Sequence, residues 1–129
     1  MTGRPQVVVV EDNDRNMKLF RDVLESSGYR TLEAETGARA VALTTEHRPD
    51  LVLMDIHLPD IDGVEALRIL RADEGTASIP VLALTAQAME GDRERFLAAG
   101  FDGYLSKPVN IADLLDAVDW IFQREAASL

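Results

Sequence analysis

Residues 7–13 read VVVVEDN, so that four consecutive valines run directly into Glu11, Asp12 and Asn13. A short run of β-branched apolar residues is typical of a strand buried on both faces, as the central strands of a parallel sheet are. Two adjacent carboxylates at the end of such a strand repel each other unless a positive charge lies nearby. The stretch therefore predicts a core strand whose terminal acids hold a cation. The alternative is that the acids only begin a loop, while Asn13 or Asp14 caps the next helix.

The composition is that of a soluble globular protein. The chain has 129 residues, 47% hydrophobic and 28% charged, and no apolar run long enough to span a membrane. This length suits one domain, and we expect residues 1–129 to form a single domain without an output domain. The start MTGRPQ lacks the apolar segment of a secretory signal, so we expect a cytoplasmic protein. The chain has no cysteine, which rules out disulfides and thiolate metal sites.

Acidic residues outnumber Lys and Arg by 23 to 13, which gives a formal net charge of −10 at pH 7. Nucleic acids and anionic membranes bind basic surfaces, so we expect no direct binding to either. Cations and basic protein surfaces are the expected partners.

Short apolar runs alternate along the chain with longer segments of helical period. Because successive strands are joined by helices, the sheet should be parallel, with right-handed crossovers and helices on both faces. We therefore predict an α/β fold, a three-layer flavodoxin-like (βα)5 domain with a parallel five-stranded sheet in the strand order 2-1-3-4-5. The predicted strands are Val7–Val10, Tyr29–Glu33, Leu51–Met54, Val81–Leu84 and Gly103–Ser106. The predicted helices are 14–27, 37–47, 63–74, 88–99 and 111–125.

Polar residues follow four of these strands, and in the predicted order the four strands are neighbours. Their carboxyl ends meet at one edge of the sheet, where open α/β folds bind ligands. Three carboxylates gathered there need compensation, which Mg²⁺ supplies because it is a hard cation that takes one or two carboxylate ligands and keeps several waters. The residues are Glu11 with Asp12, Asp55, Thr85, and Lys107 with Pro108.

A carboxylate held beside Mg²⁺ can attack phosphorus and form an aspartyl phosphate, and Asp55 is our candidate for that nucleophile. Lys107 can pair with Asp55 before the transfer and with a phosphoryl oxygen afterwards. The Thr85 hydroxyl can donate to a phosphoryl oxygen and draw its loop toward the site. Each residue alone has an ordinary reading: a solvated acid for Asp55, a turn for Lys107-Pro108 and a strand end for Thr85.

Four stretches together, VVVVEDN, LVLMDIHLPDIDG, LALTA and YLSKP, resemble the response-regulator receiver domains of bacterial two-component signalling. The resemblance runs from about Gln6 to Gln123, and the combination in this order and at these separations is specific. The start EDNDRNMKLF, and a chain that ends with its fifth helix, are similar to the single-domain DivK-type regulators.

The resemblance implies a phosphorylation-activated response regulator of a phosphorelay. A sensor histidine kinase or histidine phosphotransfer protein would donate a phosphoryl group to Asp55, and the product would act by contact with a downstream protein target. The protein would be a signalling switch and not an enzyme, with slow self-dephosphorylation at most, and a monomer or weak dimer.

The resemblance also implies roles for individual residues. Asp12, Asp55 and the backbone carbonyl of His57 would be direct Mg²⁺ ligands, and Glu11 would act mainly through water. The Lys107–Pro108 peptide bond would be cis. Tyr104 lies where the family has an aromatic residue that swings inward as the threonine moves; static packing at the sheet edge is its ordinary reading. The His57 side chain tunes access to the site or simply faces solvent.

Three further residues are candidates for a partner surface. Leu19 and Val23 depart from the apolar row Met17, Phe20 and Leu24, and they could receive a helix of the phosphodonor. Trp120 lies on the face opposite the apolar stripe of the last helix, which runs from Ile111 to Phe122, so it could anchor a partner. The segment 88–99 has few apolar residues and an internal Gly91, so we expect this helix and the loop from Thr85 to move most on phosphorylation.

Two other functions use similar folds. A flavodoxin-like electron carrier needs a phosphate-cradling loop rich in Ser, Thr and Gly after the first strand, where this chain has EDND. A metal-dependent phosphatase with Asp55 as nucleophile, of the haloacid dehalogenase type, needs a second acid two residues later, where this chain has His57. Walker-type and dinucleotide-binding glycine loops are absent from the sequence.

Overall fold

The computed structural model describes residues 4–86 and 91–127. Its strands are β1 (Gln6–Val10), β2 (Arg30–Ala34), β3 (Leu51–Asp55), β4 (Val81–Thr85) and β5 (Gly103–Ser106). Its helices are α1 (Asp14–Ser26), α2 (Gly37–His47), α3 (Gly63–Ala72), α4 (Asp92–Ala99) and α5 (Ile111–Ala127). The predicted strands and helices are confirmed within a few residues at each end, except that positions 88–90 of the fourth predicted helix lie outside the described residues.

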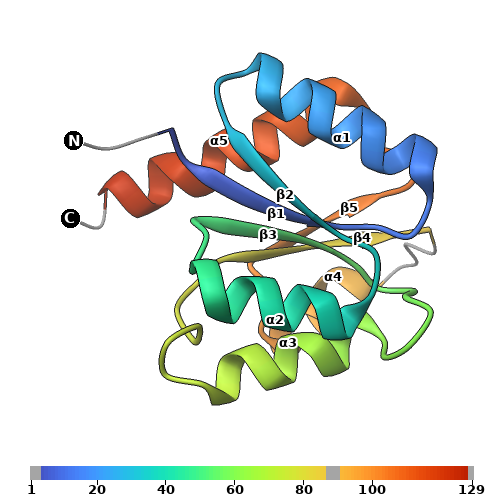
Figure 1. Cartoon of the computed structure of the whole chain (residues 1–129), viewed down its shortest axis with the longest axis vertical. Coiled ribbons are helices and arrows are strands. Elements are labelled where there is room, and N and C mark those ends of the chain that lie inside the picture. The colour runs from blue at the N-terminus through green and yellow to red at the C-terminus, as the bar shows by residue number, and fades with distance from the viewer. Residues whose placement is uncertain (1–3, 87–90, 128–129) are drawn as a thin grey trace.

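The strands form one parallel sheet in the order β2-β1-β3-β4-β5, which confirms the predicted topology. Helices α1 and α5 cover one face of the sheet, and α2, α3 and α4 cover the other (Figure 1). The edge strand β2 is only partly buried, whereas β3 and β4 are buried at every position. Apolar runs therefore mark the central strands and alternation marks the edge, as expected from their burial.

Alternate side chains of the central strands build two separate cores. Val8 and Val10 of β1 belong to the core under α2, α3 and α4, whereas Val7 and Val9 belong to the core under α1 and α5. Successive side chains of a strand point to opposite faces, so four valines in a row serve both layers equally. Each core therefore fixes the position of the strands, and with them the position of the strand ends.

Side-chain caps begin several of the helices directly after the strands. Asn13, Thr36 and Asp62 cap α1, α2 and α3 by accepting hydrogen bonds from the backbone N–H groups of Asn16, Arg39 and Glu65. Helix α4 instead begins after Gly91, which has a left-handed φ of 90°. Gly91 is therefore not inside the helix as we expected; it precedes the first turn, where its φ suits glycine.

Helix α4 is tied to the rest of the domain at its C-terminal end. The guanidinium of Arg71 on α3 donates to the carbonyl oxygens of Ile79 and Gly100, at 2.6 Å and 3.0 Å. The Arg71 guanidinium also forms an ion pair with Asp102 at 3.1 Å, and Asp102 forms a second ion pair with Arg124 of α5 at 3.0 Å. The end of α4 is thus fixed to α3 and α5 through one polar network.

Helix α5 packs through Leu114, Val118 and Ile121, which are buried as predicted. Ile111, which we expected in the same apolar stripe, is 48% exposed. It is the first residue of α5, one turn before the part of the helix that reaches the core. Trp120 is 52% exposed on the outer side, beneath the guanidinium of Arg124. No helix in the described ranges has the length and apolar character needed to cross a bilayer.

Thr44 lies on the buried face of α2, and its hydroxyl lacks a hydrogen-bond partner among the described residues. An unpaired buried hydroxyl costs about 1–3 kcal/mol, so Thr44→Val, which keeps the shape, should raise the free energy of unfolding by about 1 kcal/mol in urea denaturation. Thr76 is the matched control, since its equally buried hydroxyl donates to the Leu70 carbonyl at 2.7 Å. Thr76→Val should lower stability, and a stabilised Thr76→Val with a destabilised Thr44→Val would contradict this assignment.

Candidate active site

The ends of four neighbouring strands meet at one edge of the sheet. Asp55 and Thr85 are the last residues of β3 and β4, and Asp55 lies opposite Leu84 in the parallel register. Glu11 directly follows β1, and its backbone N–H donates to the Ala34 carbonyl of β2 at 3.0 Å. Lys107 follows β5, and its backbone N–H donates to the Thr85 carbonyl at 2.7 Å. Backbone pairing of the strands thus places these four residues at the same edge of the sheet.

Three carboxylates form a cluster at this edge. One carboxylate oxygen each from Glu11, Asp12 and Asp55 lie within 4.8 Å of one another. Glu11 is 1% exposed and Asp55 is 3% exposed, whereas Asp12 is exposed to solvent. Two acids of this cluster, which we call the acidic pit, are therefore buried, and the third is exposed.

Lys107 supplies the positive charge of the pit. Its Nζ lies 2.7 Å from Glu11 Oε1 and 2.8 Å from Asp55 Oδ2, and it donates a hydrogen bond to Asp55. The contact with Glu11 is an ion pair whose direction departs from that of a good hydrogen bond. The Lys107–Pro108 peptide bond is cis, as the family resemblance implied.

Burial and charge move the pKa values of this pair. Burial raises the pKa of the Glu11 carboxyl above its usual 4.5, although the Lys107 ammonium and the Asn13 backbone N–H partly offset the effect. Burial alone would lower the pKa of Lys107, but its contacts with Asp55 and Glu11 together outweigh burial, so the pKa lies above its usual 10.5. Lys107 is therefore a permanent cation at neutral pH.

Backbone N–H groups hold the two buried carboxylates in place. The N–H of His57 donates to Asp55 Oδ1 at 3.0 Å, and the N–H of Asn13 donates to Glu11 Oε2 at 3.1 Å. Asp55 thus has one oxygen oriented by the backbone and the other by Lys107, so its carboxylate is preorganised.

The donor set of the pit fits Mg²⁺. It contains only carboxylate oxygens, which this hard cation prefers, and one of its acids opens to the solvent that would complete the coordination. Three carboxylates and one ammonium leave a formal charge of −2, which a divalent cation cancels. Among the described residues the potential ligand atoms are those of Glu11, Asp12 and Asp55, together with nearby backbone carbonyls.

Gly63 is a site residue that our reading of the sequence missed. A Cβ at this position would lie 2.6 Å from the Asp55 carbonyl oxygen and 2.9 Å from the Ile56 Cα. The Gly63 N–H donates to the Ile56 carbonyl at 2.9 Å, which closes the loop between β3 and α3 directly behind Asp55. A glycine at the first position of a predicted helix, where it costs stability, was the signal of this close approach.

The two residues expected to act as a switch lie on the α4 side of the pit. Thr85 is 1% exposed, and Tyr104 of β5 is half-buried with its ring 5.7 Å from the ring of Phe96 on α4. Tyr104 and α4 are thus in direct contact. The expected loop from Thr85 runs through positions 87–90, which lie outside the described residues.

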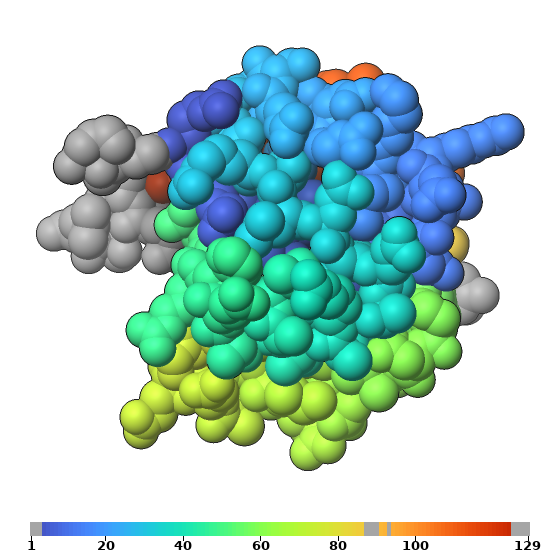
Figure 2. Space-filling view, in the orientation of Figure 1, coloured from blue at the N-terminus to red at the C-terminus, as the bar shows by residue number. Residues whose placement is uncertain are grey.

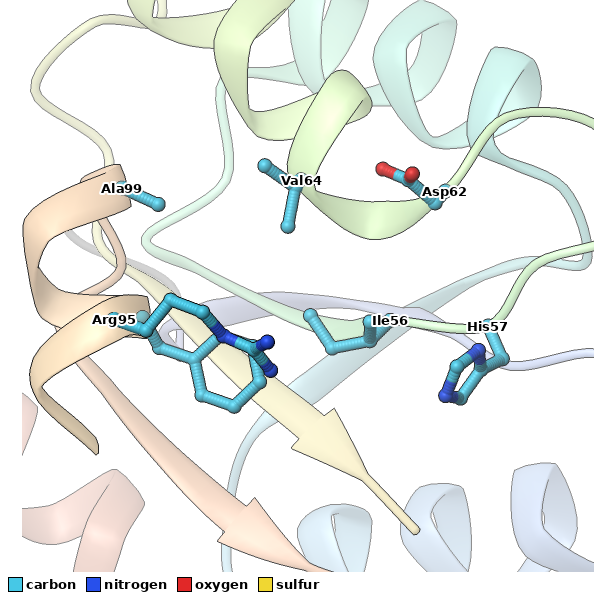
Figure 3. Close-up of a pocket in the computed structure, with 7 residues that line it drawn as sticks. Ile56, His57, Asp62, Val64, Arg95 and Ala99 are labelled. Carbon is cyan, nitrogen blue, oxygen red and sulfur yellow. The ribbon is translucent and has the colours of Figure 1, made fainter. Parts of the chain in front are cut away.

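Two grooves are lined by residues of the site or by their neighbours in the sequence. The first, of about 410 Å³, lies between the N-terminal end of α3 and α4, with Ile56, Val64 and Ala99 among its walls (Figure 3). The exposed His57 lies at the edge of this groove (Figure 3). The second, of about 350 Å³, connects Lys107 with α1. Its lining residues are Asn16, Leu19, Phe20, Ala86, Lys107, Pro108 and Val109.

Fold and site together define the class of protein. The family model of the response regulator receiver domain matches residues 7–119, so the chain belongs to this family of two-component signalling domains. The polar-differentiation response regulator DivK of Brucella anthropi is 47% identical over 112 residues, which cover 87% of this chain and 91% of that protein. The chain is therefore a DivK-like receiver domain, and nothing in its relatives favours an electron carrier or a phosphatase.

Solved structures support the same assignment. The receiver domain of a sensor histidine kinase from Pseudomonas aeruginosa is 40% identical, with a TM-score of 0.83 over 92% of this chain and 98% of that one. That structure has a magnesium ion coordinated in its active-site cleft. The receiver domain of the Francisella response regulator 1452 is 29% identical, with a TM-score of 0.88 over 95% of this chain and 99% of that one.

Removing the ammonium should make stability depend on the charge of Glu11. Lys107→Met leaves buried carboxylates facing one another, so the free energy of unfolding without divalent cations should fall by about 3 kcal/mol at pH 7. The pKa of Glu11, already above 4.5, should rise further. Between the unfolded-state and folded-state pKa values of Glu11, the folded state holds a proton that the unfolded state has released. The destabilisation caused by Lys107→Met therefore grows as pH rises through this range and is smaller at lower pH.

Urea denaturation between pH 4 and pH 8 measures this effect. The exposed Lys18→Met removes the same charge far from the pit and serves as the control. A loss of stability in Lys107→Met that is the same at every pH would contradict the assigned electrostatics.

Proposed function

We propose that this chain receives a phosphoryl group on Asp55 from a phosphohistidine of a sensor histidine kinase or histidine phosphotransfer protein. The observation that carries this proposal is the placement of the Asp55 carboxylate between the Lys107 ammonium and the His57 N–H, within reach of two further acids. Its alternatives, electron transfer and phosphatase chemistry, have no comparable support.

In the transfer, an oxygen of the Asp55 carboxylate forms a bond to phosphorus while the phosphorus–nitrogen bond of the donor breaks. The electron pair of that bond returns to the imidazole of the donor histidine. Such a reaction needs alignment and charge neutralisation more than covalent assistance. Lys107 supplies part of the neutralisation, since its ammonium is released from Asp55 Oδ2 and becomes available to a phosphoryl oxygen.

Mg²⁺ bound at the pit would supply the remaining neutralisation. We assign Asp12 and Asp55 as its direct carboxylate ligands, the His57 backbone carbonyl as a third ligand, and Glu11 as an acid that acts through water. The buried Glu11 pairs with Lys107, and the exposed Asp12 faces the opening, which is consistent with these different roles.

Phosphorylation of Asp55 would change the conformation of the protein through Thr85, Tyr104 and α4. The Thr85 hydroxyl would donate to a phosphoryl oxygen, and Tyr104, which already contacts Phe96 of α4, would follow. Helix α4 is eight residues long between two glycines of left-handed φ, so it can respond as one body. Trp120, exposed on α5, is our candidate contact for a downstream protein target. We expect the switch to act in the cytoplasm as a monomer or weak dimer.

Intact mass after incubation with acetyl phosphate and Mg²⁺ tests the function. The wild type should gain one phosphoryl group, and Asp55→Asn should gain none, because an amide oxygen is a poor nucleophile without the carboxylate charge. Chelating the metal should abolish the gain in the wild type. A wild type that stays unmodified with several donors, or an Asp55→Asn variant that is modified equally, would overturn the proposal.

A substitution in the groove beside Lys107 tests where the phosphodonor binds. Leu19 is 38% exposed there and Val23 lies one turn further along α1, so both are candidates to contact a helix of the phosphodonor. Leu19→Asp should slow transfer from a phosphorylated histidine phosphotransfer protein by about tenfold or more, because a charge enters an apolar contact. Phosphorylation by acetyl phosphate should stay unchanged.

Ile69→Asp is the matched control for this measurement, since Ile69 is 41% exposed on α3, away from the groove. Equal rates for wild type, Leu19→Asp and Ile69→Asp would place the donor elsewhere.

A further inference from the structure

A carboxylate outside the acidic pit joins the loop after β3 to the neighbouring helix α2. Asp60 lies in the connection between β3 and α3, and its two oxygens accept hydrogen bonds from the backbone N–H groups of Gly37 at 2.8 Å and Ala38 at 2.9 Å. These are the first two residues of α2, whose N–H groups have no partner within the helix. The side chain of one loop therefore caps a helix that is distant in the sequence.

The cap suits a carboxylate both electrostatically and sterically. The N–H groups of Ala38 and then Gly37 hold the pKa of Asp60 below its usual range. A Cβ on Gly37 would overlap the side chain of Ile61, so the glycine permits the close approach of loop and helix. The loop lies beside the N-terminal end of α2 in the cartoon (Figure 1) and in the space-filling picture of the same orientation (Figure 2).

Helix α2 also has a cap of its own, which satisfies a different backbone N–H group from the two that Asp60 binds. The hydroxyl of Thr36 accepts from the Arg39 N–H at 3.1 Å. Asp60 thus adds a second set of contacts to an end that is already capped, and its added effect is to restrain the loop.

That loop contains the backbone that faces the acidic pit. Near Asp55 it is held by the His57 N–H and by the hydrogen bond of the Ile56 N–H to the Leu84 carbonyl at 2.9 Å. At its far end it is held by the Gly63 N–H and by the Asp62 cap of α3. Between these points, His57, Pro59 and Asp60 are exposed, and the contacts of Asp60 with α2 fix the tip.

We propose that Asp60 is a positioning residue for the cation site: by clamping the tip of the β3–α3 loop to α2, it fixes the His57 backbone beside Asp55. This rests on the proposed function, in which the His57 carbonyl is a Mg²⁺ ligand. Outer contacts that orient metal ligands typically affect metal affinity by 10–100-fold when removed. Helix α2, which contributes no group to the pit, thereby acts on it through the Asp60 carboxylate, next to the close approach of Ile61 to Gly37.

The matched pair Asp60→Ala and Thr36→Ala tests the clamp. Each removes one cap of α2, but only Asp60→Ala releases the loop. Isothermal titration calorimetry should give about tenfold weaker Mg²⁺ binding for Asp60→Ala and wild-type affinity for Thr36→Ala. Asp60→Asn, which keeps one acceptor oxygen, should lie between wild type and Asp60→Ala.

Amide hydrogen exchange without metal gives a second readout. The His57 amide should exchange faster in Asp60→Ala than in the wild type and be unchanged in Thr36→Ala. Wild-type Mg²⁺ affinity in Asp60→Ala, or equal weakening in both alanine variants, would overturn the clamp and leave the proposed function standing. A wild type that binds no Mg²⁺ would instead overturn the proposed function, and with it the role of the clamp.

Discussion

The repulsion between three carboxylates at the end of the sheet is the constraint on which the site depends. Two of these acids are almost fully buried, and Lys107 lies within 2.8 Å of both. At 4 Å and an effective dielectric constant of about 20, each pair of like charges repels by roughly 4 kcal/mol. One ammonium offsets only part of this repulsion, and a divalent cation beside these acids would offset the rest.

The topology of the sheet creates this concentration of charge. Parallel strands end at the same edge, and the order β2-β1-β3-β4-β5 makes neighbours of the strands that carry Glu11, Asp55, Thr85 and Lys107. The valines of β1 and the apolar residues of β3 pack into the cores on both faces of the sheet. This packing fixes the strand ends and holds the charged residues close together. A phosphoryl group added at Asp55, as we propose, would change the balance of charge where the ends of these four strands meet.

Much of this arrangement was predictable from local patterns. Runs such as VVVV and LVLM identify buried strands, and the polar residue after each run identifies the site because parallel strands end together. Gly91 was wrongly placed inside a helix because apolar periodicity did not locate the start of α4. Ile111 was wrongly placed in the core because it continues the apolar stripe of α5 but stands one turn before the part of the helix that reaches the core. Sequence patterns also gave no role to Asp60 and Gly63, whose importance depends on contacts with α2 and with the Asp55 backbone.

Tertiary contacts also determine the network around Asp102 and the state of the Thr44 hydroxyl, which has no hydrogen-bond partner within the described part of the chain. A threonine within a helix has no pattern that distinguishes an unsatisfied hydroxyl from a satisfied one. Likewise, Arg71 lies on α3 and Asp102 directly precedes β5, and the two become neighbours only when α3 packs on the sheet. Local patterns therefore located the charges at the strand ends, and packing determined which contacts hold them in place.

The central claim is that these acids share one metal ion, and a crystal structure of the protein grown with Mg²⁺ tests it most directly. We expect the ion in the pit, with carboxylate oxygens of both Asp12 and Asp55 at about 2.0–2.1 Å and the Lys107 ammonium still close by. An ion bound elsewhere, or an Asp12 that stays outside the coordination sphere of an ion held by Asp55, would contradict the claim.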